Sequence, residues 1–126
     1  MENKNREIWV GKTRMYLGED NVLRITVVGE VDEETQTAFN NAAYKLAGMV
    51  EGKVNALIDL NKTGKMSTEA RKTAARMADN AKFRKLAFLG LHPVARVIAS
   101  FFMGVSQKKD MRFFRTEEEA LTWLKE

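Results

Sequence analysis

The sequence predicts an α/β protein with a single mixed, largely parallel sheet of about five strands and about four helices. A hairpin pattern near the N-terminus is followed by three further apolar segments, and each of them alternates with a helical pattern. Such alternation brings parallel strands together under a layer of helices. The apolar segments at residues 54–60 and 85–90 lack polar alternation, which is typical of strands that are buried on both faces.

The N-terminal part of the chain predicts a hairpin followed by a helix. Strands are expected at residues 14–17 and 22–28, on either side of the turn sequence GEDN, and Trp9 would extend the first of them. Apolar side chains then recur at helical spacing. Asp32 is expected to cap this helix and Gly52 to end it.

The rest of the chain predicts three strands, each with a neighbouring helix. The last helix is expected to begin with a capping box, formed by Thr116 and by Glu119 three residues later. The strands are expected at residues 54–60, 85–90 and 111–114, and the helices at residues 67–81, 93–105 and 116–125.

Length and composition restrict the class of protein. A chain of 126 residues without repeats or linkers is expected to form a single domain, residues 1–126. It contains no cysteine and one histidine, which excludes thiol nucleophiles, disulfides and Cys/His zinc sites. We therefore expect no metal site and no cofactor. The start of the chain lacks the apolar core of a signal peptide, and no run reaches the roughly 20 residues of a membrane span, so the sequence predicts a cytoplasmic protein.

The charge of the chain is mildly basic. Lysine and arginine outnumber aspartate and glutamate by 21 to 17, a net charge of +4, and the two signs are interspersed. This bias would favour acidic partners or anionic head groups, and it leaves open a weak peripheral contact with a membrane. A nucleic-acid binder usually gathers basic and aromatic side chains on one face, so no nucleic-acid partner is expected.

Three segments of the chain resemble a known family. The sequence VVGEVDEETQTAF, with Gly29, Glu30 and Asp32, resembles the G-E-L-D-x-x-T segment between the second strand and the first helix of STAS domains, the fold of bacterial anti-sigma-factor antagonists. ALIDL is similar to their central strand, and the ending MRFFRTEEEALTWLKE resembles the SpoIIAA-like branch of that superfamily, whose function is uncharacterised. The resemblance extends over the chain from about Arg14 onward. It implies a STAS/SpoIIAA-like fold and a regulatory module that binds other proteins.

The stretch IDLNKTGKMSTEA leads from a predicted strand through a glycine-containing loop into a predicted helix. In phosphoregulated STAS proteins this region carries a D-S-S-G motif with a phosphorylated serine. Here Ser67 or Thr68 matches that serine, but Met66 replaces the aspartate and no glycine follows. A role as helix N-cap is therefore favoured for Ser67. The candidate anion-binding or regulatory site consists of Lys62, Lys65, Ser67 and Thr68.

The apolar helix expected at Pro93–Val105 is the second candidate surface. Its apolar side chains span an arc of about 160°, wider than the roughly 100° that a helix needs to cover one sheet. Burial under neighbouring elements is the simpler interpretation. The alternatives are a homodimer contact, a lipid contact or the wall of an apolar ligand pocket. The residues of this candidate association or ligand surface are Val97, Phe101, Phe102 and Met103.

The sequence contains no pattern that specifies a reaction. Asp32 is explained by capping and Asp59 by hydrogen bonds to its own loop, and no nucleophile with an adjacent base is found, so we expect that the protein is not an enzyme. Two functions are compatible with the sequence. The first is a STAS-like regulatory or interaction module that acts through a protein partner or as a homodimer. The alternative is a carrier or sensor of a small apolar, amphipathic (lipid-like) or anionic ligand.

Overall fold

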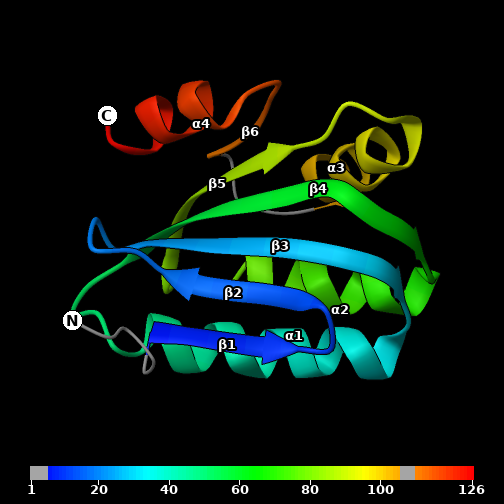
Figure 1. Ribbon diagram of the computed structural model, residues 1–126, viewed down its shortest axis with the longest axis horizontal. Coiled ribbons are helices and arrows are strands. Elements are labelled where there is room, and N and C mark those ends of the chain that lie inside the picture. Colours follow the sequence, from blue (N-terminus) through cyan, green and yellow to red (C-terminus); the bar gives the residue numbers. More distant parts are fainter. Residues whose placement is uncertain (1–5, 106–109) are drawn as a thin grey trace.

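The computed structural model describes residues 6–105 and 110–126. Within these residues it has one six-stranded sheet and four helices (Figure 1). The predicted α/β class is confirmed, with a sixth strand beyond the expected number. The strands are β1 Glu7–Val10, β2 Thr13–Leu17, β3 Val22–Val31, β4 Val54–Met66, β5 Phe83–Leu89 and β6 Met111–Phe114, and the helices are α1 Glu33–Ala47, α2 Thr68–Ala78, α3 Pro93–Val105 and α4 Glu117–Leu124.

The strands lie across the sheet in the order of the sequence, from β1 to β6. The first three strands are antiparallel neighbours, and β3 to β6 run parallel. The additional strand is β1, which contains Trp9 and turns back onto β2 instead of extending it. Gly11 in the turn has a φ of 60°, and a positive φ at the first position of a two-residue turn suits a tight hairpin.

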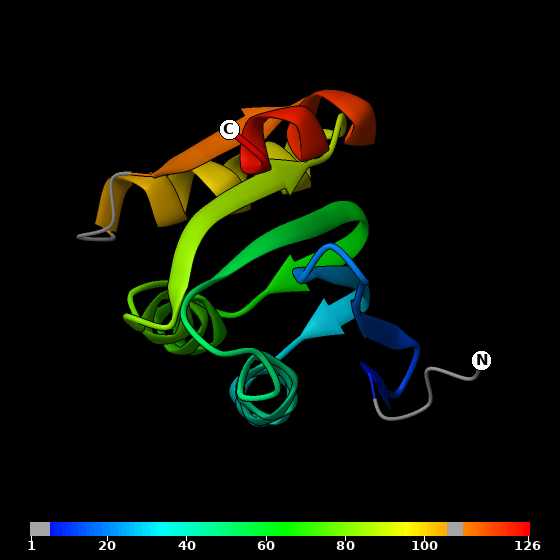
Figure 2. The ribbon, with the colours of Figure 1, turned by 90° about the vertical axis from the view of Figure 1, so that its left-hand side faces the viewer.

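Three helices cover one face of the sheet, and the fourth covers part of the other face. The crossovers between the parallel strands pass through α1, α2 and α3 in turn, and right-handed crossovers in one direction place these helices on the same face. α4 follows β6 and packs on the opposite face, where Trp123 lies against Leu57 and Ala87. Figure 2 shows α1 and α2 end-on and side by side, away from α4.

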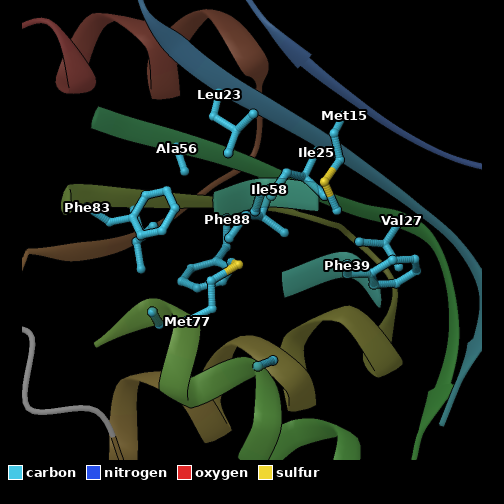
Figure 3. Packing of buried hydrophobic residues seen from close by; sticks show 14 of the residues in the cluster. Met15, Leu23, Ile25, Val27, Phe39, Ala56, Ile58, Met77, Phe83 and Phe88 are labelled. Carbon is cyan, nitrogen blue, oxygen red and sulfur yellow. The ribbon is translucent and has the colours of Figure 1, made fainter. Parts of the chain in front are cut away.

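The larger core lies between the sheet and helices α1, α2 and α3. Alternate residues of the central strands point into it, such as Ile25 on β3, Ile58 on β4 and Phe88 on β5 (Figure 3). One buried hydrogen bond joins two of the helices, because Nδ2 of Asn40 in α1 donates to the carbonyl oxygen of Thr73 in α2 at 2.9 Å. A directional bond in an apolar contact fixes the position of α1 relative to α2.

β4 is longer than the sequence predicts, because it continues through residues 61–66. These residues remain paired with the end of β3, up to Val31 opposite Met66, with two register shifts on the way. Gly64 allows the close approach of the two strands, since a Cβ there would lie 3.2 Å from the backbone nitrogen of Glu30. The prediction of a loop at residues 61–66 is therefore wrong. Residues 61–66 are mostly polar, so they show no strand pattern of their own. They are extended because they pair with β3, which is distant in the sequence.

The predicted helix starts are confirmed more closely than the helix ends. The carboxylate of Asp32 accepts a hydrogen bond from the backbone N–H of Thr35 at 2.8 Å, and this bond holds the pKa of Asp32 below its ordinary value. α1 ends at Ala47, before the predicted stop at Gly52, and the N–H groups of Met49 and Val50 then donate three residues back, to Leu46 and Ala47, as in turns. α2 and α4 also end earlier than predicted, at Ala78 and Leu124, whereas the predicted end of α3 at Val105 is confirmed.

Candidate functional site

The candidate anion-binding or regulatory site lies where β4 ends and α2 begins. Lys62 and Lys65 are exposed on the last part of the strand, and Ser67 and Thr68 are exposed at the start of the helix. The hydroxyl oxygen of Ser67 accepts a hydrogen bond from the backbone N–H of Ala70 at 3.0 Å. Ser67 is therefore the N-cap of α2, as its position in the sequence predicts.

The role of Ser67 as a cap predicts the effect of its substitution. Ser67→Ala should lower the free energy of unfolding by about 1 kcal/mol, measured by urea denaturation, because the N–H of Ala70 loses its acceptor. Ser67→Asp should remain close to wild type, since aspartate is an equally good cap and its charge is favourable at a helix N-terminus. Thr68→Ala is the matched control, with an expected change below about 0.5 kcal/mol. Equal losses for Ser67→Ala and Thr68→Ala would show that the cap is unimportant.

The residues of the second candidate surface divide between the core and the exterior. Phe102 is 5% exposed and its ring centroid lies 5.5 Å from that of Phe88, so it belongs to the core. Phe101 is half-buried and contacts Phe102 edge-on at 6.0 Å. Val97 and Met103 are 57% and 41% exposed. One of the two adjacent phenylalanines thus fills the core, while the outer face of α3 keeps exposed apolar side chains.

A groove of about 350 Å³ lies between the end of β4, the first turns of α2 and the start of α3. It joins the two candidate sites, because Lys65 from the first and Val97 from the second both line it. The other predicted residues do not line the groove. The full lining is Lys65, Met66, Arg71, Pro93, Val94, Val97 and Ile98.

Arg71 contributes the second cationic group of the groove. Its guanidinium carbon lies 5.2 Å from the centroid of the Phe101 ring, which indicates a cation–π contact between α2 and α3. Neither Arg71 nor Met66 belongs to the candidate site that the sequence predicts. Their place in the groove depends on how α2 and α3 lie side by side, and no local pattern reports that.

The charge around the groove is positive. Two cationic side chains, Lys65 and Arg71, line the groove, and none of its described lining residues is acidic. α3 contains no acidic residue at all. An anionic ligand or an acidic protein surface would therefore be attracted to this part of the molecule.

The single histidine, His92, holds the start of α3 in place. Its Nε2 lies 2.9 Å from the carbonyl oxygen of Leu60, and its Nδ1 lies 3.3 Å from the backbone nitrogen of Ala95. In the tautomer that carries its proton on Nε2, Nε2–H donates to the carbonyl oxygen of Leu60 and Nδ1 accepts from the N–H of Ala95. The ring therefore serves as a helix cap, and both nitrogens are used. In the described part of the chain, no group of three or more His, Cys, Asp or Glu side chains is arranged to hold a metal ion.

Among the helices of residues 6–105 and 110–126, none combines the length and the apolar character needed to cross a membrane.

The strand order and the three crossover helices on one face give the chain a SpoIIAA-like fold. The chain belongs to the family described as Domain of unknown function (DUF7793), whose model matches residues 15–126. No curated protein sequence matches it.

Three solved structures show the same fold. A DUF3478-family protein from Shewanella loihica PV-4, described as having a SpoIIAA-like fold, is 20% identical with a TM-score of 0.66, over 89% of this chain and 91% of that chain. The anti-sigma factor antagonist SpoIIAA in its unphosphorylated form is 14% identical with a TM-score of 0.60, over 90% and 97%. An anti-sigma factor antagonist from Mycobacterium paratuberculosis is 17% identical with a TM-score of 0.66, over 91% and 94%. At these identities the similarity establishes the shared fold.

Proposed function

We propose that the protein is a non-enzymatic, cytoplasmic STAS-like regulatory module that binds a protein partner through the groove between α2 and α3. The observation that carries the proposal is the position of this groove. It lies beside the capped start of α2, on a fold that two anti-sigma factor antagonists share. The groove therefore supports the function of an interaction module, because it offers a surface to a protein partner.

The composition of the groove supports this assignment. Val94 and Val97 expose apolar area in the groove, and Lys65 and Arg71 supply positive charge. Protein interfaces commonly combine an apolar centre with a polar rim, and arginine is enriched among the residues that contribute most to binding. The expected partner surface is apolar and flanked by acidic residues. Because Ser67 already serves as a cap and the D-S-S-G motif is incomplete, we expect that binding does not require phosphorylation of Ser67.

The test is site-specific photo-crosslinking in the host cell, followed by measurement with the purified partner. A benzophenone amino acid at Val97 should form a cross-link to one protein, whereas the same group at Met49, an exposed apolar position after α1, should not. Val97→Asp should then weaken binding of the purified partner by about tenfold or more, equal to about 1.4 kcal/mol. Met49→Asp should leave the affinity unchanged.

Several outcomes distinguish the alternatives. A cross-link from Val97 to a second copy of the chain would identify the partner as the protein itself, and the groove as a homodimer interface. Identical cross-linking patterns from Val97 and Met49 would contradict the proposal, as would equal affinities for Val97→Asp and the wild type.

A further inference from the structure

The larger core contains a small cavity of about 40 Å³ between the sheet and the helices α1, α2 and α3. Several of its lining residues are shown in Figure 3, among them Met15, Phe39 and Met77. The lining is apolar apart from Gln36, whose amide nitrogen donates to Oδ1 of Asn40 at 2.9 Å. Apolar cavities of this kind stay dry and accept small apolar groups.

Met66 separates this cavity from the groove on the surface. Its side chain lines both the cavity and the groove, and it is half-buried. Methionine has three rotatable bonds and adapts its shape readily. Met66 is the residue that the described linings of the groove (about 350 Å³) and the cavity (about 40 Å³) share, so a passage between the two spaces would run past its side chain.

Arg71 provides an unsatisfied polar group at the same place. Its Nε is buried, and among the described residues it has no hydrogen-bond partner. Neither Arg71 nor Lys65 forms an ion pair with a carboxylate of the described chain. An unpaired buried donor is unfavourable, and most such groups in proteins are satisfied by a partner, a water or an ion. An anionic group in the groove would meet the positive charges of Arg71 and Lys65, which both line it.

From these three observations we propose that the groove and the cavity form one site for a medium-chain aliphatic carboxylate. The carboxylate accepts hydrogen bonds from Arg71 and Lys65, and the chain lies against Val94, Val97 and Ile98. The end of the chain passes Met66 and enters the apolar cavity. The groove volume lies within the range of roughly 300–1,000 Å³ that is usual for small-molecule sites. This site goes beyond the proposed partner binding, because it requires no second protein, and a bound carboxylate would compete with a partner for Val94 and Val97.

Decanoate is a suitable probe, and the purified full chain can be studied without modification. With ¹³C-labelled methionine methyl groups, a titration at neutral pH should shift the NMR signals of Met66, Met15 and Met77, because these residues line the groove or the cavity. The signal of Met49, which is 43% exposed at a distant position, should not move. Decanol, which has the same chain without a charge, should bind about tenfold more weakly or worse.

Two variants test the contribution of Arg71. Arg71→Gln should weaken decanoate binding by about tenfold or more, whereas Arg76→Gln, an exposed residue on the same helix, should bind like the wild type. If Arg71→Gln does not fold, Arg71→Lys keeps the charge but loses the forked donor, and it should weaken binding by a smaller factor.

The proposal would be overturned if saturating decanoate moved neither Met15 nor Met77 in the wild-type protein, or if Met49 shifted equally. It would also fail if decanol bound as tightly as decanoate, or if the protein bound vesicles of anionic lipid but not decanoate, which would indicate a membrane-surface contact instead. The decanoate titration uses the purified chain, whereas the cross-linking uses the host cell. Failure of the ligand proposal can therefore be distinguished from failure of the partner proposal.

Discussion

Replacement of Phe102 by alanine is expected to lower the free energy of unfolding by about 3–5 kcal/mol. Phe102 is 5% exposed, packs against Phe88 with ring centroids 5.5 Å apart, and borders the core cavity. Loss of the ring would remove these contacts and enlarge a space that the surrounding sheet and helices cannot close. Urea denaturation of the purified protein, followed by circular dichroism, measures the loss.

The neighbouring residue is the matched control for this substitution. Phe101 has the same chemistry and lies on the same helix, but it is only half-buried and contacts Phe102 edge-on. Phe101→Ala is therefore expected to lower the free energy of unfolding by about 1 kcal/mol, which is less than the stabilisation from a fully buried phenylalanine. Equal losses for the two variants would mean that α3 is rotated differently on the sheet from the arrangement described above.

Replacement of Gly90 by alanine is expected to cost about 1–3 kcal/mol or more and to move the start of α3. A Cβ at Gly90 would lie 2.4 Å from the Cβ of Ala95 and 3.4 Å from the Cβ of Leu60. The first distance is far below a van der Waals contact, and Ala95 has no flexible side chain that could move away. The whole first turn of α3 must therefore shift, and Val94 and Val97 in the groove must shift with it.

Gly104, a glycine within α3 itself, serves as the control. An added Cβ there would meet no atom of the described residues within 4 Å. Gly104→Ala is expected to leave the stability unchanged or to raise it by about 0.5–1 kcal/mol, because alanine favours the helix. A comparison of both variants by urea denaturation separates the steric effect at Gly90 from a general effect of glycine replacement. A Gly90→Ala protein as stable as the wild type would contradict the close packing of α3.

The sequence by itself determined those features that depend on near neighbours in the chain. The helix starts at Asp32, Ser67 and Thr116 were predicted from residue type, because each side chain accepts a hydrogen bond from a backbone N–H three residues later. The α/β class followed from apolar periodicity, which reports which side of an element is buried. Lys65 and Val97 were identified in the same way, as a basic residue at a helix start and an apolar residue on a wide helical face.

Only the tertiary structure decided which distant residues meet. The extension of β4 through residues 61–66 depends on pairing with β3, and strand pairing is not visible in a polar segment taken alone. The choice of Phe102 for the core depends on how α3 is rotated against Phe88. The groove itself exists because α2 and α3 place Arg71 and Met66 beside Val97. The physical reason is that packing against a partner surface fixes strand register and helix rotation, whereas the local sequence specifies only which residue types can take part.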